Sequence, residues 1–388
     1  MYTSILLSTL TAAASGASLP TGAISFALVR KGDYSAYLTK LKVGTPPQEE
    51  YLLVDTGSGT ISFENPNNNV CSLESKPCAE YGTFDNTSSS TCHWISNDFG
   101  DGLIDFGSGS VLQDIVQIGD QNVGPLQFGY LDDYGFGVEQ VAVPTATILG
   151  LALLCNKFDD SCYQSGYYLV PELYEKKKIN RRSVSIYLGP EAPTVNNSEV
   201  ILGSAYDKAK QGSTPFKLPM AYFNSETNSV NASAISSTIN GDVTRLPLNP
   251  FNTTLIDTGN PLLTIPEPLW SQVMASLGNP NETHTSHVGG IYVDCKYREL
   301  PNTEKISYEF GGNPDNRIDV PLSQLVIDFN NGTCGADISN GYEISNGIGV
   351  LGDPFIRQTY LTFDFEDFTV TMAQARFTSD RDVVPFGN

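Results

Sequence analysis

Basic side chains are scarce in this chain of 388 residues. Lys and Arg number 22 against 43 Asp and Glu residues, so the formal net charge is −21 at pH 7. A surface this acidic repels a phosphate backbone, which excludes nucleic acid as a partner. The excess of carboxylates serves solubility. It also suits an acidic environment, where protonation removes the repulsion between them.

Long hydrophobic segments are also missing. The apolar run at residues 5–14 is too short to span a bilayer, and it passes into small residues that end at Ala17. This pattern is typical of a secretory signal peptide, which we predict over residues 1–17. The C-terminus lacks the hydrophobic tail of a lipid-anchor signal. We therefore expect a secreted protein without a membrane anchor, with an acidic compartment such as the vacuole as the alternative location.

Several catalytic motifs are absent too. The chain contains no Gly-x-Ser-x-Gly and no Gly-Lys-Ser/Thr sequence, which argues against a serine hydrolase and against a P-loop nucleotide enzyme. It contains no Cys-x-x-Cys, and the pair His284 and His287 has no further ligands at metal-site spacing. We expect neither a metal nor a cofactor.

The cysteines and glycosylation sequons that are present fit a secreted protein. Pairing each cysteine with a neighbour leaves Cys92 free and gives Cys71–Cys78, Cys155–Cys162 and Cys295–Cys334. The pair Cys71–Cys92 is the alternative, and the sequence does not decide between them. Six Asn-x-Ser/Thr sequons predict glycosylated surface loops at Asn86, Asn196, Asn231, Asn252, Asn281 and Asn331.

Hydrophobic patterning predicts an all-β protein. From residue 37 onward, short runs of β-branched and aromatic residues alternate with Gly, Asn and Pro turns. We expect strands that include residues 51–54, 115–118, 183–188 and 360–363, and helices at 169–178 and 268–277. The stretch 224–240 is rich in Asn, Ser and Thr, and we interpret it as a surface excursion.

The chain also contains an internal repeat. The sequence Leu-Val-Asp-Thr-Gly-Ser at residues 53–58 recurs as Leu-Ile-Asp-Thr-Gly-Asn at residues 255–260. Each copy is followed later in the chain by a second repeated motif, Ile-Leu-Gly at 148–150 and Val-Leu-Gly at 350–352, which we call the echo motifs. The repeat predicts two related lobes, residues 18–203 and 204–388, each with one Asp at the end of an apolar strand.

The two repeated aspartates, Asp55 and Asp257, suggest a shared chemistry. If the lobes face each other, the two carboxyl groups come within hydrogen-bond reach, and both cannot ionise at low cost. They then share one proton at acid pH. The ionised group can take a proton from a water while its protonated partner polarises a carbonyl. A duplicated structural turn without activity is the alternative.

Further segments resemble the pepsin-like aspartic peptidases, particularly the secreted fungal ones, from about residue 24 to residue 386. The matching segments are residues 43–48 (VGTPPQ), 81–85 (YGTFD), 88–91 (SSST), 351–355 (LGDPF) and 363–365 (FDF). The resemblance implies a bilobal fold of two β-barrel-like lobes with a cleft between them. It also implies a monomeric acid endopeptidase that acts on extended peptides or denatured proteins.

The same resemblance assigns roles within the two repeated loops. It makes Asp55 and Asp257 the catalytic pair, lets Thr56 and Thr258 exchange hydroxyl contacts between the lobes, and has Ser58 support the outer oxygen of Asp55. The remaining supporting residues are Gly57, Gly259 and Asn260.

The chain departs from this family at three places. No Tyr occurs between residues 94 and 116, where the family carries its flap Tyr, so Leu103 and Phe106 are the flap candidates, with Phe99 as a further option. The family's Trp after the first loop is absent. Asn260 stands where Ser or Thr is usual, although an amide can still donate to Asp257. These departures motivate an alternative function, a secreted binding protein that keeps the pepsin fold with impaired catalysis.

Overall fold

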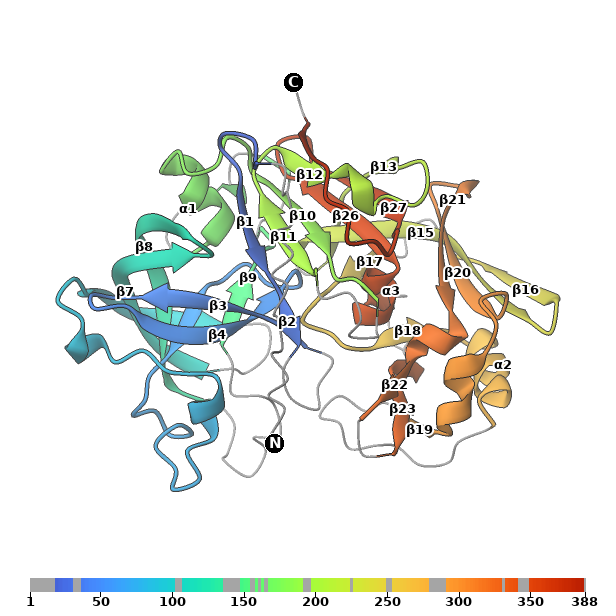
Figure 1. Ribbon diagram of the computed structural model, residues 1–388, viewed down its shortest axis with the longest axis horizontal. Coiled ribbons are helices and arrows are strands. Elements are labelled where there is room, and N and C mark those ends of the chain that lie inside the picture. The colour runs from blue at the N-terminus through green and yellow to red at the C-terminus, as the bar shows by residue number, and fades with distance from the viewer. Residues whose placement is uncertain are drawn as a thin grey trace, which may run out of the picture.

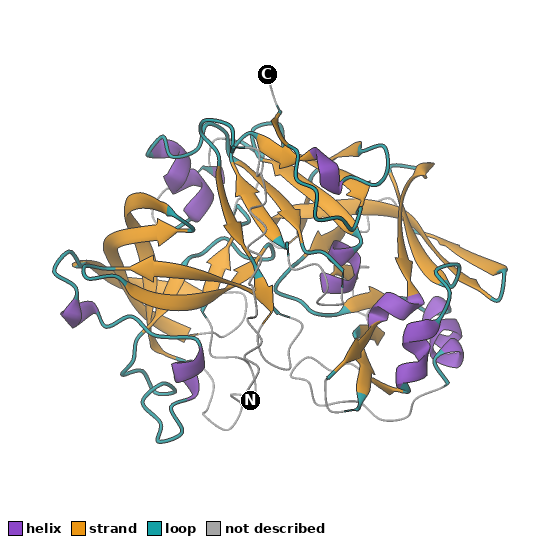
Figure 2. Ribbon diagram, viewed as in Figure 1, coloured by secondary structure: helices purple, strands orange, loops and turns teal. Residues whose placement is uncertain are grey.

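The computed structural model describes residues 18–386 apart from 31–35, 102–106, 135–146, 154–157, 160–161, 164–166, 191–196, 224–225, 249–252, 279–290, 330–331 and 341–348. The chain is mostly β-strand with a few short helices, and it forms two lobes that meet at a central sheet (Figures 1 and 2). The predicted all-β, bilobal architecture is confirmed.

The first lobe is built on an eight-stranded sheet. Its order is β5-β8-β7-β3-β4-β9, with β2 on β3 and β6 on β7. In chain order the strands are β2 (Val29–Arg30), β3 (Tyr37–Val43), β4 (Gln48–Asp55), β5 (Ser62–Glu64), β6 (His93–Asp101), β7 (Gly107–Ile118), β8 (Gln121–Asp133) and β9 (Ile148–Gly150).

The second lobe is built on a nine-stranded sheet. Its order is β21-β20-β15-β17-β25-β18-β24, with β14 and β16 also on β15. The strands are β14 (Ala221–Phe223), β15 (Glu226–Ile239), β16 (Asp242–Pro247), β17 (Thr253–Ile256), β18 (Leu263–Ile265), β20 (Lys305–Phe310), β21 (Asn313–Pro321), β24 (Ile338–Asn340) and β25 (Gly349–Leu351).

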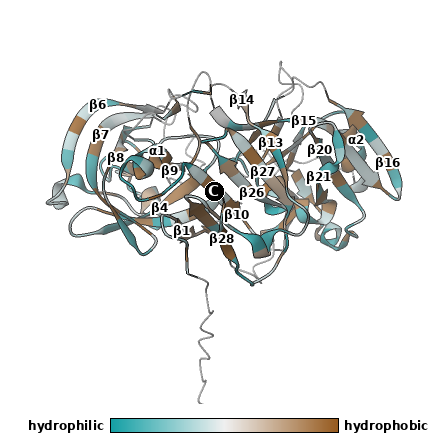
Figure 3. Ribbon diagram, turned by 90° about the horizontal axis from the view of Figure 1, so that it is seen from above, coloured by the Kyte–Doolittle hydropathy of each residue, from teal (hydrophilic) through white to brown (hydrophobic). Residues whose placement is uncertain are grey.

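A six-stranded sheet joins the lobes. Its order is β1-β11-β10-β26-β27-β13, and the antiparallel pair β10–β26 is the seam between strands from the two halves of the chain. Viewed from above, the lobes lie on either side of β10 and β26, and hydrophobic residues recur along the strands of both (Figure 3). The division of the chain at residues 203 and 204 stays a prediction. The strands are β1 (Ile24–Ala27), β10 (Ser183–Tyr187), β11 (Glu199–Leu202), β13 (Phe216–Pro219), β26 (Thr359–Asp364) and β27 (Thr369–Gln374).

Two small sheets and three α-helices complete the described fold. One sheet pairs β12 (Ala205–Asp207) with β28 (Val383–Pro385), and the other joins β19 (Ile291–Val293), β23 (Cys334–Ala336) and β22 (Val326–Asp328). The helices are α1 (Leu169–Glu175), α2 (Leu269–Ser276) and α3 (Asp353–Arg357). No helix in the described part of the chain is long and apolar enough to cross a membrane.

The expected helices form at slightly different lengths. Helix α1 ends at Glu175 rather than at residue 178, because the backbone turns left-handed at Lys177, where φ is 57°. Helix α2 is followed by Gly278 with φ of 82°, a conformation that glycine adopts without strain and that commonly terminates a helix.

The interpretation of residues 224–240 as a surface excursion is wrong. Most of this stretch is β15, a central strand that pairs with β14, β16, β17 and β20. Asn228 and Ser229 are fully buried there, as are Val230 and Ile235. Buried polar side chains in an interior strand need hydrogen-bond partners. A polar composition therefore does not by itself indicate a surface segment.

Candidate active site

The first repeated loop begins where β4 ends at Asp55. Alternate residues of β4 face the core, and Leu52 and Val54 are fully buried. Strand β9 pairs parallel with β4 and places Gly150 opposite Asp55. The loop then turns so that the Gly57 N–H and the Ser58 hydroxyl donate to the two oxygens of Asp55, at 2.7 and 2.6 Å. The Asp55 carboxyl is thus held at both oxygens, with the side chain only 8% exposed.

The second loop is built in the same way. Strand β17 ends at Ile256 and pairs parallel with β25, and the N–H of Asp257 donates to the carbonyl of Leu351 at 3.1 Å. The Gly259 N–H donates to Asp257 Oδ1 at 2.7 Å. Asp257 is half-buried. The internal repeat in the sequence therefore corresponds to two equivalent carboxyl-bearing loops.

The glycines of the two echo motifs pack against these loops. A Cβ on Gly150 would lie 2.5 Å from the backbone of Gly59 and Thr60, and one on Gly352 would lie 2.2 Å from the carbonyl oxygen of Asn260. Real side chains do not tolerate such distances. The repeat of Ile/Val-Leu-Gly after each Asp-Thr-Gly is thus explained by close backbone contact at the site.

Two threonines tie the loops to each other. The hydroxyl of Thr56 donates to the Ile256 carbonyl at 2.7 Å, and that of Thr258 donates to the Val54 carbonyl at 2.6 Å. Each hydroxyl also accepts the backbone N–H of the other threonine, at 3.0 Å in both directions. All four groups are buried, where hydrogen bonds are costly to break. The expected exchange between the lobes is present in the structure.

The glycines of the two loops show that the carboxyls lie together. A Cβ on Gly57 would lie 2.6 Å from Asp257 Cγ. A Cβ on Gly259 would lie 2.7 Å from Asp55 Oδ1 and 3.0 Å from Asp257 Oδ1, so these two oxygens are no further apart than the sum of those distances. Each loop therefore places its glycine against the carboxyl group of the other.

If the paired carboxyls are the reacting groups, Gly57→Ala should lower kcat/KM by about 100-fold, because the new Cβ must displace the Asp257 carboxyl and misplacement of a reacting group by about 1 Å costs that much. Steady-state kinetics and thermal unfolding measure the effect. The matched control is Gly100→Ala in β6, where a new Cβ meets no atom within 4 Å. It should leave kcat/KM within about twofold. Equal activity of the two variants would contradict this geometry.

Ser58 and Asn260 occupy equivalent positions in the two loops. Ser58 donates to Asp55, whereas the side-chain oxygen of Asn260 accepts the Leu262 N–H at 2.8 Å and so caps its own loop. The start of α3 also holds this loop, because the Asp353 N–H donates to the Asn260 carbonyl at 2.9 Å. The Asn260 oxygen thus braces the backbone of its own loop, and the expected donation from its amide to Asp257 stays a prediction.

Of the three flap candidates, the structure describes Phe99. Strands β6 and β7 form the expected hairpin, but Leu103 and Phe106 lie outside the described residues. Phe99 is buried and packs edge-on against Tyr167, with ring centroids 5.6 Å apart. Phe99 is therefore a packing residue of this lobe.

Two of the expected disulfides, Cys71–Cys78 and Cys295–Cys334, are present. Cys162 is also disulfide-bonded, and its expected partner Cys155 lies outside the described residues. Cys92 is a free thiol whose pKa is raised by burial to about 11, which makes it poorly reactive.

Glycosylation stays a prediction. Asn231 is exposed on β15, and Asn86 is half-buried beside Tyr130. The remaining sequons, at Asn196, Asn252, Asn281 and Asn331, lie outside the described residues.

A buried pair of glutamates in the first lobe was not anticipated from the sequence. Glu50 and Glu64 are at most 1% exposed. The Glu64 N–H and the Thr147 hydroxyl both donate to Glu50 Oε1 at 2.9 Å, while Tyr134 and Asn68 donate to the two oxygens of Glu64. Burial raises the pKa of Glu64 to about 8, and burial together with the nearby Glu64 raises the pKa of Glu50 well above its usual value. The sequence carries no signal for this pair, since Glu50 follows Gln48 and Glu49 in β4 and Glu64 ends the short strand β5.

Glu64 also lies beside the sulfurs of Cys71 and Cys78, close enough for a shared ligand site. Those sulfurs are joined in a disulfide and carry no thiolate, so the cluster lacks the ligands that a metal needs.

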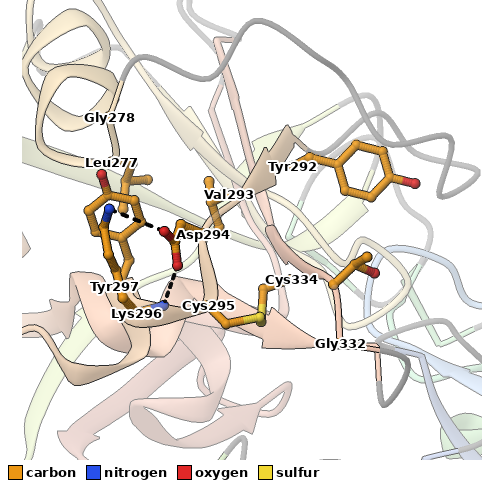
Figure 4. Close-up of a pocket in the computed structure, with 11 residues that line it drawn as sticks. Leu277, Gly278, Tyr292, Val293, Asp294, Cys295, Lys296, Tyr297, Gly332 and Cys334 are labelled. Atoms are coloured by element: carbon orange, nitrogen blue, oxygen red, sulfur yellow. Dashed lines mark hydrogen bonds and ion pairs between the residues drawn. A yellow bond between two sulfur atoms is a disulfide. The ribbon is translucent and has the colours of Figure 1, made fainter.

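A cavity of about 750 Å³ lies in the second lobe, away from the two carboxyls, beside the Cys295–Cys334 disulfide (Figure 4). Asp294 and Lys296, which line it, form an ion pair at 3.1 Å, so their charges neutralise each other. The other lining residues are Leu277, Gly278, Tyr292, Val293, Tyr297, Gly332 and Thr333. The charged residues in its lining are this one ion pair.

Comparison with known proteins identifies the family. A model of the eukaryotic aspartyl proteases matches residues 36–375, and this chain belongs to that family. It is 26% identical over 380 residues to aspartic proteinase yapsin-3 of Saccharomyces cerevisiae, and the aligned region covers 92% of this chain and 69% of the relative. It is 25% identical over 363 residues to the probable aspartic-type endopeptidase opsB of Aspergillus oryzae (89% and 70%). It is 26% identical over 407 residues to secreted aspartic protease 7 of Candida albicans (96% and 65%). The chain is an aspartic-type endopeptidase, and the earlier resemblance is confirmed.

Proposed function

We propose that this protein is a secreted acid endopeptidase in which Asp55 and Asp257 activate one water molecule between them. The observation that carries the proposal is the reciprocal contact of the loops, since each glycine lies against the opposite carboxyl group. Two carboxyls so placed can hold one proton between them. One ionised and one protonated group are what peptide hydrolysis needs.

The reaction follows from that protonation state. The ionised carboxylate takes a proton from water as the water oxygen bonds to the scissile carbonyl carbon, and the protonated carboxyl gives its proton to the carbonyl oxygen. The resulting gem-diol then loses a proton to one carboxylate while the other carboxyl protonates the leaving nitrogen. The C–N bond breaks, and the pair returns to its starting state. The hydrogen bonds from Gly57, Ser58 and Gly259 hold the carboxyls in place throughout.

The substrate class follows from the fold. Extended peptides and denatured proteins can lie between two lobes as a strand, with backbone hydrogen bonds providing affinity. Secretion is proposed from the signal-peptide pattern at residues 1–17, and one relative is named as a secreted protease. An acidic compartment would supply the proton that the pair shares.

The test is proteolysis by purified protein. Cleavage of a denatured protein is measured across a series from pH 2 to pH 8, with and without a statine-type inhibitor, which mimics the gem-diol. We expect cleavage in acid that the inhibitor abolishes. No cleavage by folded protein at any acid pH would overturn the proposal.

A second candidate function is binding of peptides with impaired turnover. It is favoured by Asn260, which stands where the family carries Ser or Thr and whose side-chain oxygen accepts the Leu262 N–H of its own loop. Tight binding of the statine-type inhibitor together with no turnover would support this candidate. Rapid turnover would exclude it.

A further inference from the structure

A side chain of the second lobe reaches the active-site loop of the first. Asn228 is fully buried in β15, and its Nδ2 donates to the backbone carbonyl of Thr56 at 3.0 Å. Strand β15 pairs with β17, and Ser229 lies opposite Leu255, two residues before Asp257. The strand that supports the Asp257 loop therefore also contacts the Asp55 loop.

This contact completes the anchoring of Thr56. The backbone N–H of Thr56 donates to Thr258 and its hydroxyl donates to the Ile256 carbonyl. With Asn228 on the carbonyl, the second lobe provides a partner for each polar group of Thr56. Asn228 thus serves the residue that directly follows Asp55.

The peptide unit explains why this carbonyl matters. The carbonyl of Thr56 and the N–H of Gly57 belong to one planar unit, and in a trans peptide they point in opposite directions. That N–H donates to Asp55 Oδ1 at 2.7 Å. A donor on the carbonyl therefore fixes the direction of the N–H, and it also polarises the unit so that the N–H becomes a stronger donor.

The contact is specific to one lobe. Leu38 lies opposite Leu53 in β3 and β4, as Ser229 lies opposite Leu255 in β15 and β17. The position equivalent to Asn228 is therefore Tyr37, which offers a phenol in place of a carboxamide. The carboxamide at this position therefore serves the Asp55 loop.

We propose that Asn228 is a positioning residue for Asp55, which orients the Thr56–Gly57 peptide unit and so the N–H that binds the carboxylate. The proposal rests on the proposed role of Asp55 and Asp257 in acid proteolysis. Asn228 acts through that peptide unit, so its loss should alter the chemical step more than substrate binding.

Two variants test this. Asn228→Leu removes the donor at similar size and should lower kcat about 10-fold with KM within about twofold, and it should move the acid limb of the kcat/KM profile to higher pH. Asn228→Asp keeps the shape, and its protonated form can still donate to the carbonyl. It should work nearly as well as wild type at the acid end and lose activity as pH rises, because the ionised form repels the carbonyl.

The matched control is Ser229→Ala, the next residue of β15. Ser229 is equally buried, and its hydroxyl has no hydrogen-bond partner among the described residues, so its removal deletes a buried hydroxyl without breaking a described bond. It should leave kcat, KM and the pH profile unchanged. Thermal unfolding at the assay pH confirms that each variant is folded.

The outcomes separate the two levels of the proposal. The proposed role of Asn228 is wrong if the wild type is active and the Asn228 variants have the same kcat and pH profile as Ser229→Ala. It is also wrong if the Asn228 variants change KM alone. If Asn228→Leu does not fold, the pH dependence of kcat/KM for Asn228→Asp tests the role of Asn228 instead. A folded wild type without acid proteolysis overturns the proposed function and this inference with it.

Discussion

Asp257→Asn and Asp55→Asn are each expected to lower kcat/KM by about 10⁴-fold or more. The proposed reaction needs one ionised and one protonated carboxyl, and an amide can neither accept nor give the protons involved. The double variant should be barely less active than either single one, because the two groups act as a unit. Cleavage of a fluorogenic peptide at acid pH measures all three.

The matched control for these variants is Asp207→Asn. Asp207 is a buried carboxyl in β12, and its Oδ1 accepts the backbone N–H groups of Ala209 and Asp382. An amide oxygen can accept the same bonds, so this variant should retain activity. Appreciable turnover by folded Asp257→Asn would show that the paired loops are not the catalytic centre.

Stability is expected to fall steeply as the pH rises from about 5 to about 8, because of Glu50 and Glu64. An acid whose pKa is higher in the folded than in the unfolded state binds its proton more tightly when folded. Below the ordinary pKa of 4.5, the protonated carboxyl makes its full contribution to the free energy of unfolding. This contribution is lost as the pH rises toward the pKa of Glu64 in the folded protein, which is about 8. The loss for one such group is on the order of 4 kcal/mol.

Glu64→Gln should flatten this dependence. A neutral amide can accept from Asn68 and donate to Tyr134, so it reproduces the protonated acid without ionising. Thermal unfolding at pH 4, 6 and 8 should show a smaller decrease for this variant than for wild type. Glu49→Gln, at the exposed neighbour of Glu50, is the control and should follow wild type. Equal wild-type stability at pH 5 and pH 8 would contradict the role of the buried pair.

The sequence predicted those features that a local pattern encodes. The strand ending in Asp-Thr-Gly occurs twice. The two loops, the glycines of the echo motifs and the threonine exchange could therefore be inferred from the sequence alone. Neighbouring cysteines were predicted to pair, and Cys71–Cys78 and Cys295–Cys334 do so. Such features depend on residues close in sequence or on a duplicated motif.

Contacts between distant polar residues could not be predicted in this way. Asn228 lies in a segment whose composition indicates a surface loop, and its partner is 172 residues away. Glu50 and Glu64 are ordinary acidic residues in sequence, and only the packed lobe shows that both are shielded from water. The Asn260 side-chain oxygen accepts the Leu262 N–H, a contact within the loop that the repeated motif does not indicate.

The seam between β10 and β26 means that chain continuity is not what keeps the two lobes joined. Residues 212–215, which lie between β12 and β13, are exposed. The β10–β26 pair instead joins Ser183–Ile186 to Leu361–Asp364 in the interior. A peptide-bond break in that connection would leave a two-chain protein whose halves remain held by a backbone ladder and by the threonine exchange. The catalytic geometry is thus a property of an interface, as it would be in a dimer of separate subunits.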